Sequence, residues 1–300
     1  MQFPHGFMPT ANPAGAGRRG MRPEAIIAAM TSRRHLLLGS LAAPFSAAWA
    51  QQRRSLEEPL RLGADNALVD SGLAQALQHA FGRDTGVAVQ LLRSPALAVL
   101  AAVERGELDA ALCNAPEAEA KLEKQTLVHD RRLVARGGYV IVGPAVKGKV
   151  RDPAGIAGGK DVVQALAQIR EMAGATPGLL SFLSANDGSG THLAEQALWR
   201  AAKAAPAAPW YTMAEPAIGL AAQARALNAY ALVERGVWAA YGGAPLAVLV
   251  DADPLLAEEV HVMRPFRANH PAGKLFVEWV GGPKGRSLAA GHRGYKAAAA

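Results

Sequence analysis

Residues 60–117 read LRLGADNALVDSGLAQALQHAFGRDTGVAVQLLRSPALAVLAAVERGELDAALCNAPE and alternate strand and helix patterns three times. Short apolar runs at residues 60–63, 87–92 and 108–112 are strand candidates, and each precedes a segment typical of a helix. Consecutive strand–helix units form parallel sheets, because the chain must cross back over one face between strands. The fold class predicted from this stretch is therefore α/β.

The alternation continues along the rest of the chain. Further strands are predicted at residues 137–144, 179–183, 229–233, 246–250 and 259–263, and further helices at residues 161–173, 193–199, 217–227 and 274–280. The last helix ends at Gly281-Gly282-Pro283, and the tail beyond it is expected to fray. The 300 residues, of which 50% are hydrophobic, suffice for about two domains.

The N-terminal region has the pattern of an export signal. Arg33-Arg34 precedes an apolar run at residues 36–49, and residues 48–50 have the small-x-small form of a cleavage site. A basic pair before an apolar run resembles the twin-arginine signal. The alternative, a membrane anchor, needs about 20 apolar residues. Residues 1–50 are therefore predicted to be a disordered leader plus a signal peptide, and the protein is predicted to be periplasmic.

The basic charge of the chain belongs largely to this N-terminal region. A net charge of +7 would by itself suggest a nucleic-acid or membrane-surface partner. Five of the 32 basic residues and one of the 25 acidic residues lie within residues 1–50, which leaves a net charge of +3. We therefore predict no nucleic-acid partner.

Three loops lie where ligands bind in open α/β sheets, beyond the carboxyl ends of strands. They comprise residues 63–67, 114–116 and 184–191. The glycines of the third loop permit a concave backbone whose N–H groups could hold an oxyanion. A plain capping turn, in which Ser189 and Thr191 only cap a helix, is the alternative reading of the residues alone.

No motif for catalysis or metal binding occurs in the chain. His192 lies close to Asp187 and Ser189 in sequence, but a helix start does not orient these groups for a proton relay. The single cysteine, Cys113, excludes an intrachain disulfide and a cysteine-rich zinc site. We therefore predict a protein that is not an enzyme and that uses no cofactor and no metal.

Short segments spread over residues 60–285 resemble a known family when they are taken in order. These segments are residues 70–73, 106–110, 114–119, 139–144, 152–156, 187–192, 197–199, 210–211, 230–236 and 253–256. With this set the chain resembles the tungstate-binding proteins of bacterial ABC importers, which have the type II periplasmic binding-protein fold.

The resemblance implies two lobes, each with a mixed sheet flanked by helices, and a ligand cleft between them. It implies that the chain crosses between the lobes near Val142 and near Val260. The first lobe would then comprise residues 51–141 and 264–300, and the second lobe residues 142–263. It further implies a monomer that closes over an oxyanion by a hinge motion and delivers it to an ABC permease in the inner membrane.

Two positions depart from the pattern of the family. Its first loop is a run of threonines and serine, whereas this chain has Ala64-Asp65-Asn66-Ala67, and the arginine that follows the serine of the third loop is replaced by Ala185. An aspartate at position 65 would repel an oxyanion by about 4 kcal/mol at about 4 Å and an effective dielectric constant of about 20. Asn66 could still donate through its amide.

The predicted ligand-binding residues are Asp65, Asn66, Asn114, Ser184, Asp187, Ser189, Gly190, Thr191 and Arg235. Glu234 and Arg235 are also interpreted as a structural ion pair, and a cleft-facing Arg235 is the alternative. The favoured function is periplasmic capture of a small oxyanion such as tungstate or molybdate. The alternatives are a different small polar, zwitterionic or cationic ligand in the same fold, and a periplasmic sensor that does not serve transport.

Overall fold

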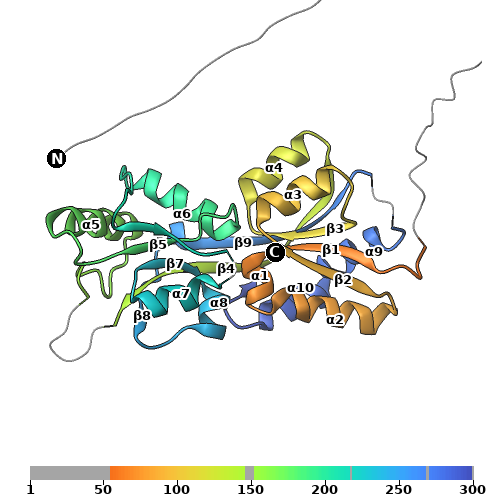
Figure 1. Ribbon diagram of the computed structural model, residues 1–300. Coiled ribbons are helices and arrows are strands. Elements are labelled where there is room, and N and C mark those ends of the chain that lie inside the picture. The colour runs from red at the N-terminus through yellow and green to blue at the C-terminus, as the bar shows by residue number, and fades with distance from the viewer. Residues whose placement is uncertain (1–54, 146–151, 217, 268–269, 299–300) are drawn as a thin grey trace, which may run out of the picture. The chain divides into compact units, whose positions relative to one another are not determined.

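The computed structural model describes residues 55–145, 152–216, 218–267 and 270–298, and the statements below concern these residues. The predicted leader and signal peptide, residues 1–50, lie outside them. Within the described ranges, no helix combines the length and the apolar character needed to cross a membrane. The strands form mixed sheets that are flanked by helices, so the predicted α/β class is confirmed (Figure 1).

The first lobe is built on a mixed sheet with the strand order β2-β1-β3-β9-β4-β10. Its strands are β1 (Leu60–Asp65), β2 (Val89–Ser94), β3 (Ala110–Cys113), β4 (Val128–Pro144), β9 (Ala257–Pro265) and β10 (Lys296–Ala297). β1 pairs in parallel with β2 and β3, as the strand–helix pattern predicts, whereas β9 runs antiparallel to β3 and β4. β1 is therefore an interior strand of this sheet, between β2 and β3.

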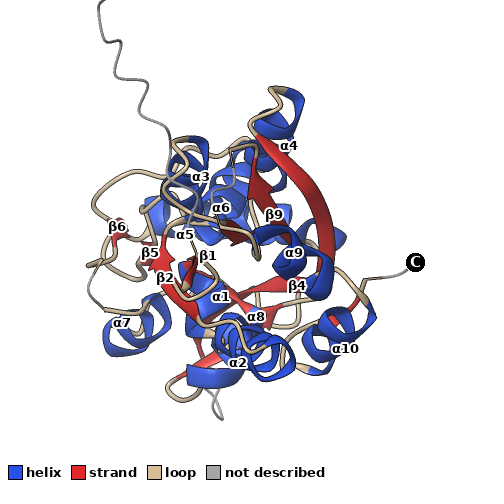
Figure 2. Ribbon diagram, turned by 90° about the vertical axis from the view of Figure 1, so that its right-hand side faces the viewer, coloured by secondary structure: helices blue, strands red, loops and turns tan. Residues whose placement is uncertain are grey.

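Helices cover both faces of the first sheet (Figure 2). They are α1 (Asn66–Asp70), α2 (Leu73–Thr85), α3 (Ala96–Glu104), α4 (Pro116–Lys124), α9 (Gly273–Val280) and α10 (Pro283–Gly291). α2 and α9 pack on one face, where Phe81 and Phe276 meet edge to face with ring centroids 4.9 Å apart. α3 packs on the opposite face through Val99 and Val103. Burial of these apolar faces fixes the starts of α1 and α3 beside the end of β1.

The second lobe continues β4 into another mixed sheet. Its other strands are β5 (Phe182–Ser184), β6 (Tyr211–Met213), β7 (Ala231–Glu234) and β8 (Leu246–Val250). β7 and β8 pair with β4, β5 pairs in parallel with β6, and a bridge between Phe182 and Tyr230 joins the two groups. The helices are α5 (Val162–Ala175), α6 (Gly190–Ala201), α7 (Leu220–Leu227), α8 (Arg235–Tyr241) and the 3₁₀ turn η1 (Pro254–Leu256).

Strand pairing changes between the lobes a few residues before Val142 and before Val260, the positions near which the resemblance implies the crossings. β4 pairs with β9 up to Gly138 and with β7 from Tyr139 onward, so the chain leaves the first sheet before Val142. β9 pairs with first-lobe strands along its length from Ala257, so the return precedes Val260. We propose that the lobe boundaries lie at these two changes of strand pairing. The sequence of one continuous apolar strand does not show where that strand changes partners.

The tail is also more ordered than predicted. Beyond Gly282 the chain forms α10, whose first residue is Pro283, and then β10, which pairs with β4. The buried Ala289 and Tyr295 attach this tail to the core of the first lobe. A proline is well suited to the first turn of a helix, because its missing N–H has no partner there in any case.

Candidate ligand-binding site

The carboxylate of Asp65 is the centre of the seam between the two lobes. Asp65 ends β1, and its side chain is fully buried. Oδ1 accepts a hydrogen bond from the backbone N–H of Ala67 at 2.9 Å, and Oδ2 accepts from Ala96 N at 2.9 Å and Gly190 N at 3.1 Å. Ala67 and Ala96 belong to the first lobe and Gly190 to the second. Three backbone donors from both lobes thus converge on one anionic group.

These donors come from helix starts, where N–H groups lack partners inside the helix and the helix dipole favours negative charge. Pro95 precedes α3 and offers no side-chain acceptor, so the N–H of Ala96 is free to bond Asp65. Ser189 caps α6 by accepting from His192 N at 3.2 Å, which leaves Gly190 N for Asp65. The arrangement is a cradle for a carboxylate-like anion, made of neutral backbone groups from α1, α3 and α6.

The hydrogen bonds of the cradle offset part of the free energy that desolvation of the Asp65 carboxylate costs. Burial raises the pKa of Asp65 to about 6, and the nearby charge of Asp187 adds to the increase. The hydrogen bonds from Ala67, Gly190 and Ala96 oppose it, because they favour the ionised form. Asp65 is therefore an anion at neutral pH that protonates more easily than an exposed aspartate.

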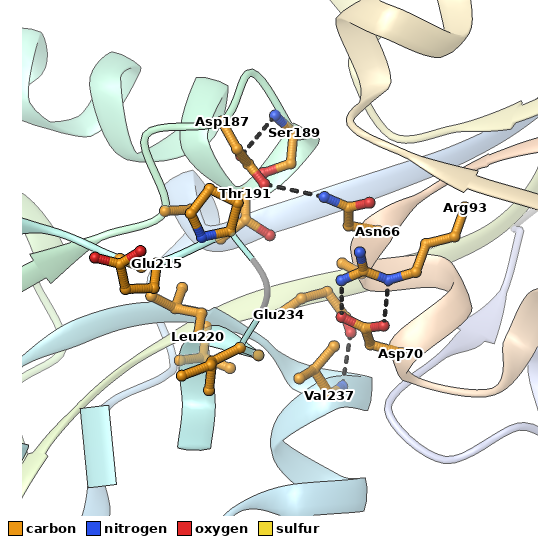
Figure 3. Close-up of a pocket in the computed structure, with 17 residues that line it drawn as sticks. Asn66, Asp70, Arg93, Asp187, Ser189, Thr191, Glu215, Leu220, Glu234 and Val237 are labelled. Carbon is orange, nitrogen blue, oxygen red and sulfur yellow. Dashed lines mark hydrogen bonds and ion pairs between the residues drawn. The ribbon is translucent and has the colours of Figure 1, made fainter. Parts of the chain in front are cut away.

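A small cavity of about 70 Å³ lies beside the cradle and between the lobes (Figure 3). Asn66 lines it from the first lobe, and Asp187, Ser189 and Thr191 line it from the second. The Asn66 amide donates to Asp187 Oδ2 at 3.0 Å, and Asp187 Oδ1 accepts from Ser189 N at 2.9 Å. The structure thus brings together these predicted residues with Asp65 and Gly190.

The lining of this cavity, called the cradle pocket below, is rich in carboxylates. Asp70, Asp187, Glu215 and Glu234 line it together with one arginine, Arg93. Arg93 forms a two-pronged ion pair with Asp70, with both N···O distances at 2.7 Å. The guanidinium charge is therefore already balanced, and the pocket offers an entering anion mainly backbone and hydroxyl donors.

Three predicted residues lie outside both the N–H cradle and the cradle pocket. Ser184 is buried at the end of β5 and lies beside Glu195 rather than at the seam. Asn114 donates to Glu258 Oε1 at 2.6 Å, on the other side of Gly190. Arg235 lies in a separate hollow. All three residues lie at the end of a strand, which is why the sequence predicts them at the site. Each side chain, however, points toward its own interaction partner.

The predicted Glu234–Arg235 ion pair is wrong. Arg235 donates to the backbone oxygen of Asp251 at 2.9 Å and pairs with the Asp251 carboxylate at 3.5 Å. Glu234 instead caps α8 by accepting from Gly236 N at 2.7 Å and Val237 N at 2.8 Å. Neighbouring residues at the junction of a strand and a helix point in different directions, so adjacency in sequence does not make them a pair.

Several residues of the site have little or no signal in the sequence. Ala67 and Ala96 contribute only backbone N–H groups, which leave no side-chain signal, although a proline at position 95 is typical of a helix start. Arg93 near the end of β2 and Asp70 at the end of α1 had a weak signal, because β2 neighbours β1 in parallel. Side chains at the carboxyl ends of adjacent parallel strands meet at one edge of the sheet.

His192 is engaged with its own helix and loop. Its Nδ1 accepts from Gly188 N at 3.0 Å, and its Nε2 lies 2.9 Å from the Gln196 amide. Burial lowers the pKa of His192. The Ser189 hydroxyl accepts from the backbone of His192, so the ring and the hydroxyl do not form a nucleophile–base pair.

A larger cavity of about 350 Å³ lies between α4 and α6. The lining is mostly apolar, and its polar residues are Asn114, Glu117, Tyr139, Gln196, Arg200, Glu258 and Glu259. Gly190 lines this cavity, whereas Ser189 and Thr191 line the cradle pocket. The start of α6 therefore separates the two cavities.

The fold and the site agree with comparisons to known proteins. The family model of the PBP superfamily domain matches residues 60–283. The chain belongs to this superfamily. Its fold is the type II periplasmic binding-protein fold, so the family resemblance read from the sequence is confirmed.

Individual relatives of this superfamily member carry names of anion-binding transport proteins. This chain is 27% identical over 237 residues to the tungstate-binding protein TupA of Peptoclostridium acidaminophilum. The matched region covers 76% of this chain and 79% of TupA. The chain is 32% identical over 184 residues to a Haloferax volcanii protein named as an ABC transporter anion-binding protein. That match covers 61% of this chain and 51% of the relative, so the chain spans about half of that relative's length.

A solved structure with a similar fold is that of the tungstate ABC transporter from Geobacter sulfurreducens. It superposes with a TM-score of 0.65 and is 28% identical in sequence. The match covers 77% of this chain and 97% of the Geobacter chain. The similarity therefore includes both lobes and the seam between them.

Proposed function

We propose that this chain is the solute-binding protein of an ABC importer and that it captures a small oxyanion of the tungstate or molybdate type. The observation that carries the proposal is the convergence of three backbone N–H groups from both lobes on one carboxylate. Such groups bind oxyanions without a formal positive charge. The family and the names of its relatives support the same function.

The cellular setting proposed here follows from the predicted export signal and from the family. The protein would be exported by a twin-arginine-type signal within residues 1–50 and act in the periplasm as a monomer. Its partner would be an ABC permease in the inner membrane, which recognises the closed form. Because the mature chain carries a net charge of about +3, we propose no nucleic-acid partner.

A second candidate function is supported by the charge of the cradle pocket. Asp187 and Glu215 line it beside the Arg93–Asp70 ion pair and the buried Glu234, so its unpaired charges are negative. Such a lining favours a small cationic or zwitterionic solute over a free anion. The two candidates differ in whether the ligand occupies the N–H cradle or only the acidic pocket beside it.

Calorimetric titration with sodium tungstate, molybdate and sulfate tests the proposal. We expect tungstate or molybdate to bind and to stabilise the protein by about 2.7 kcal/mol at about a hundredfold excess over the dissociation constant. Lys284→Ala removes a surface cation that pairs with Asp84 on α2, and it should leave binding unchanged. Absence of both heat and a thermal shift up to millimolar oxyanion would contradict this function and favour the second candidate.

A further inference from the structure

The cradle at the seam is already occupied by a group of the protein itself. Each backbone N–H donates one hydrogen bond, and those of Ala67, Ala96 and Gly190 all go to the Asp65 carboxylate. A solute oxyanion therefore cannot use these donors while Asp65 holds them. Two anions in one buried cradle would also repel each other strongly.

Helix capping alone does not explain this arrangement. An N-cap aspartate accepts from the first turn of its own helix, which accounts for the bond from Ala67 at the start of α1. The bonds from Ala96 and Gly190 come from α3 and α6, which start 31 and 125 residues away from Asp65 in the sequence. Oδ2 of Asp65 thus joins one donor of the first lobe to one of the second.

We propose that the Asp65 carboxylate is an internal competitor of the solute oxyanion, which enters the cradle only by displacing it. The inference rests on the proposed function, because it assigns the cradle to the solute. The Asp65 carboxylate satisfies the donors of both lobes and joins the lobes across the seam. Exchange of one anion for another keeps these buried N–H groups paired, whereas simple removal of Asp65 would leave them unpaired.

The surroundings of Asp65 agree with a carboxylate that can be displaced. Arg93 lines the adjoining cradle pocket and interacts with the charge of Asp65, so a displaced carboxylate can turn toward this guanidinium, which it would share with Asp70. Asp187 lies on the second-lobe side and repels it. The affinity for the solute is therefore set by the difference between two binding free energies, that of the solute in the cradle and that of the Asp65 carboxylate in the cradle.

Tungstate titration of three proteins tests the inference: wild type, Asp65→Asn and Asp65→Thr. Both variants remove the competing charge, and threonine can also donate a hydroxyl. We expect each variant to bind tungstate at least about tenfold more tightly than wild type, since the solute no longer displaces an anion. Two substitutions are used so that misfolding of one, detected by thermal unfolding, does not remove the test.

Asp161→Asn is the matched control. Asp161 caps α5 by accepting from Gln164 N, so it is an aspartate cap away from the seam, and its variant should bind tungstate like wild type. Equal affinity of wild type and folded Asp65 variants would overturn the inference and leave the proposed function standing. Failure of wild type and both folded variants to bind any oxyanion would overturn the proposed function, and the inference with it.

Discussion

Replacing Gly190 with alanine is expected to weaken tungstate binding by between about tenfold and about a hundredfold. A β-carbon at this position would overlap the side chain of Asn114, which is buried and bonded to Glu258. The start of α6 must then move away from the first lobe, and the Gly190 N–H no longer points at an anion held by Ala67 and Ala96. Loss of one hydrogen bond to a charged group costs about 1.5–3 kcal/mol.

Gly174→Ala is the control for this glycine substitution. Gly174 lies in the last turn of α5, and a β-carbon there would meet no atom outside the adjacent backbone of its own helix within 4 Å. Alanine in a helix interior is favoured over glycine by about 0.5–1 kcal/mol, so this variant should be slightly more stable and bind normally. Calorimetric titration and thermal unfolding measure both effects. Wild-type affinity in Gly190→Ala would show that the start of α6 does not hold the ligand.

The stability of the protein is expected to fall as the pH rises from about 5 to about 9. Glu234 at the end of β7 and Glu258 in β9 are 1% and 3% exposed, and their carboxyls interact with each other. Burial raises the pKa of Glu234 to about 7, and burial together with the charge of Glu234 raises that of Glu258 well above its usual range. The pair therefore retains a proton in the folded protein that the unfolded chain releases.

The sign of the effect follows from these raised pKa values. The folded state binds more protons than the unfolded state, so the stabilisation is complete below about pH 4.5 and is lost as the pH rises through about 7. The two carboxyls titrate as a coupled pair, so this loss belongs to Glu234 and Glu258 together. Burial also raises the pKa of Glu195 to about 7 and that of Asp65 to about 6, which adds to the same trend.

Urea unfolding at about pH 5, 7 and 9 measures this dependence. Glu258→Gln should flatten the decrease in unfolding free energy, because one of the two coupled carboxyls is then neutral at every pH. Glu171→Gln on the exposed surface of α5 is the control and should keep the wild-type dependence. A wild-type protein that becomes more stable between about pH 5 and about pH 9 would contradict the shared proton.

The fold could be predicted to a large extent because it depends on local patterns. The strand–helix units of residues 60–117 carry their own periodicity, and they form the parallel part of the first sheet. The residues at which strand pairing changes between the lobes could not be predicted, because β4 is one strand that pairs with β9 over its first part and with β7 and β8 over its last. Such a change of partner depends on the whole fold rather than on the strand.

The candidate site was predictable only where side chains face the seam. Asn66, Asp187, Ser189 and Thr191 lie together in the cradle pocket, in loops that the strand pattern had placed there. Asp65 was recognised as unfavourable for an oxyanion, but its bonds to three helix starts could not be read from the sequence. Those donors are backbone groups, and their convergence is a property of the packed lobes.

The most direct test of the oxyanion cradle follows the backbone amides themselves. In ¹⁵N–¹H correlation spectra of the ¹⁵N-labelled protein, addition of tungstate should shift the amide resonances of Ala67, Ala96 and Gly190 more than those of the surrounding residues. The same resonances should already be shifted in ligand-free Asp65→Asn, because the anion that they bond is removed. Tungstate-dependent shifts confined to residues around the larger cavity, such as Ala115 and Ala197, with these three amides unchanged, would contradict the cradle.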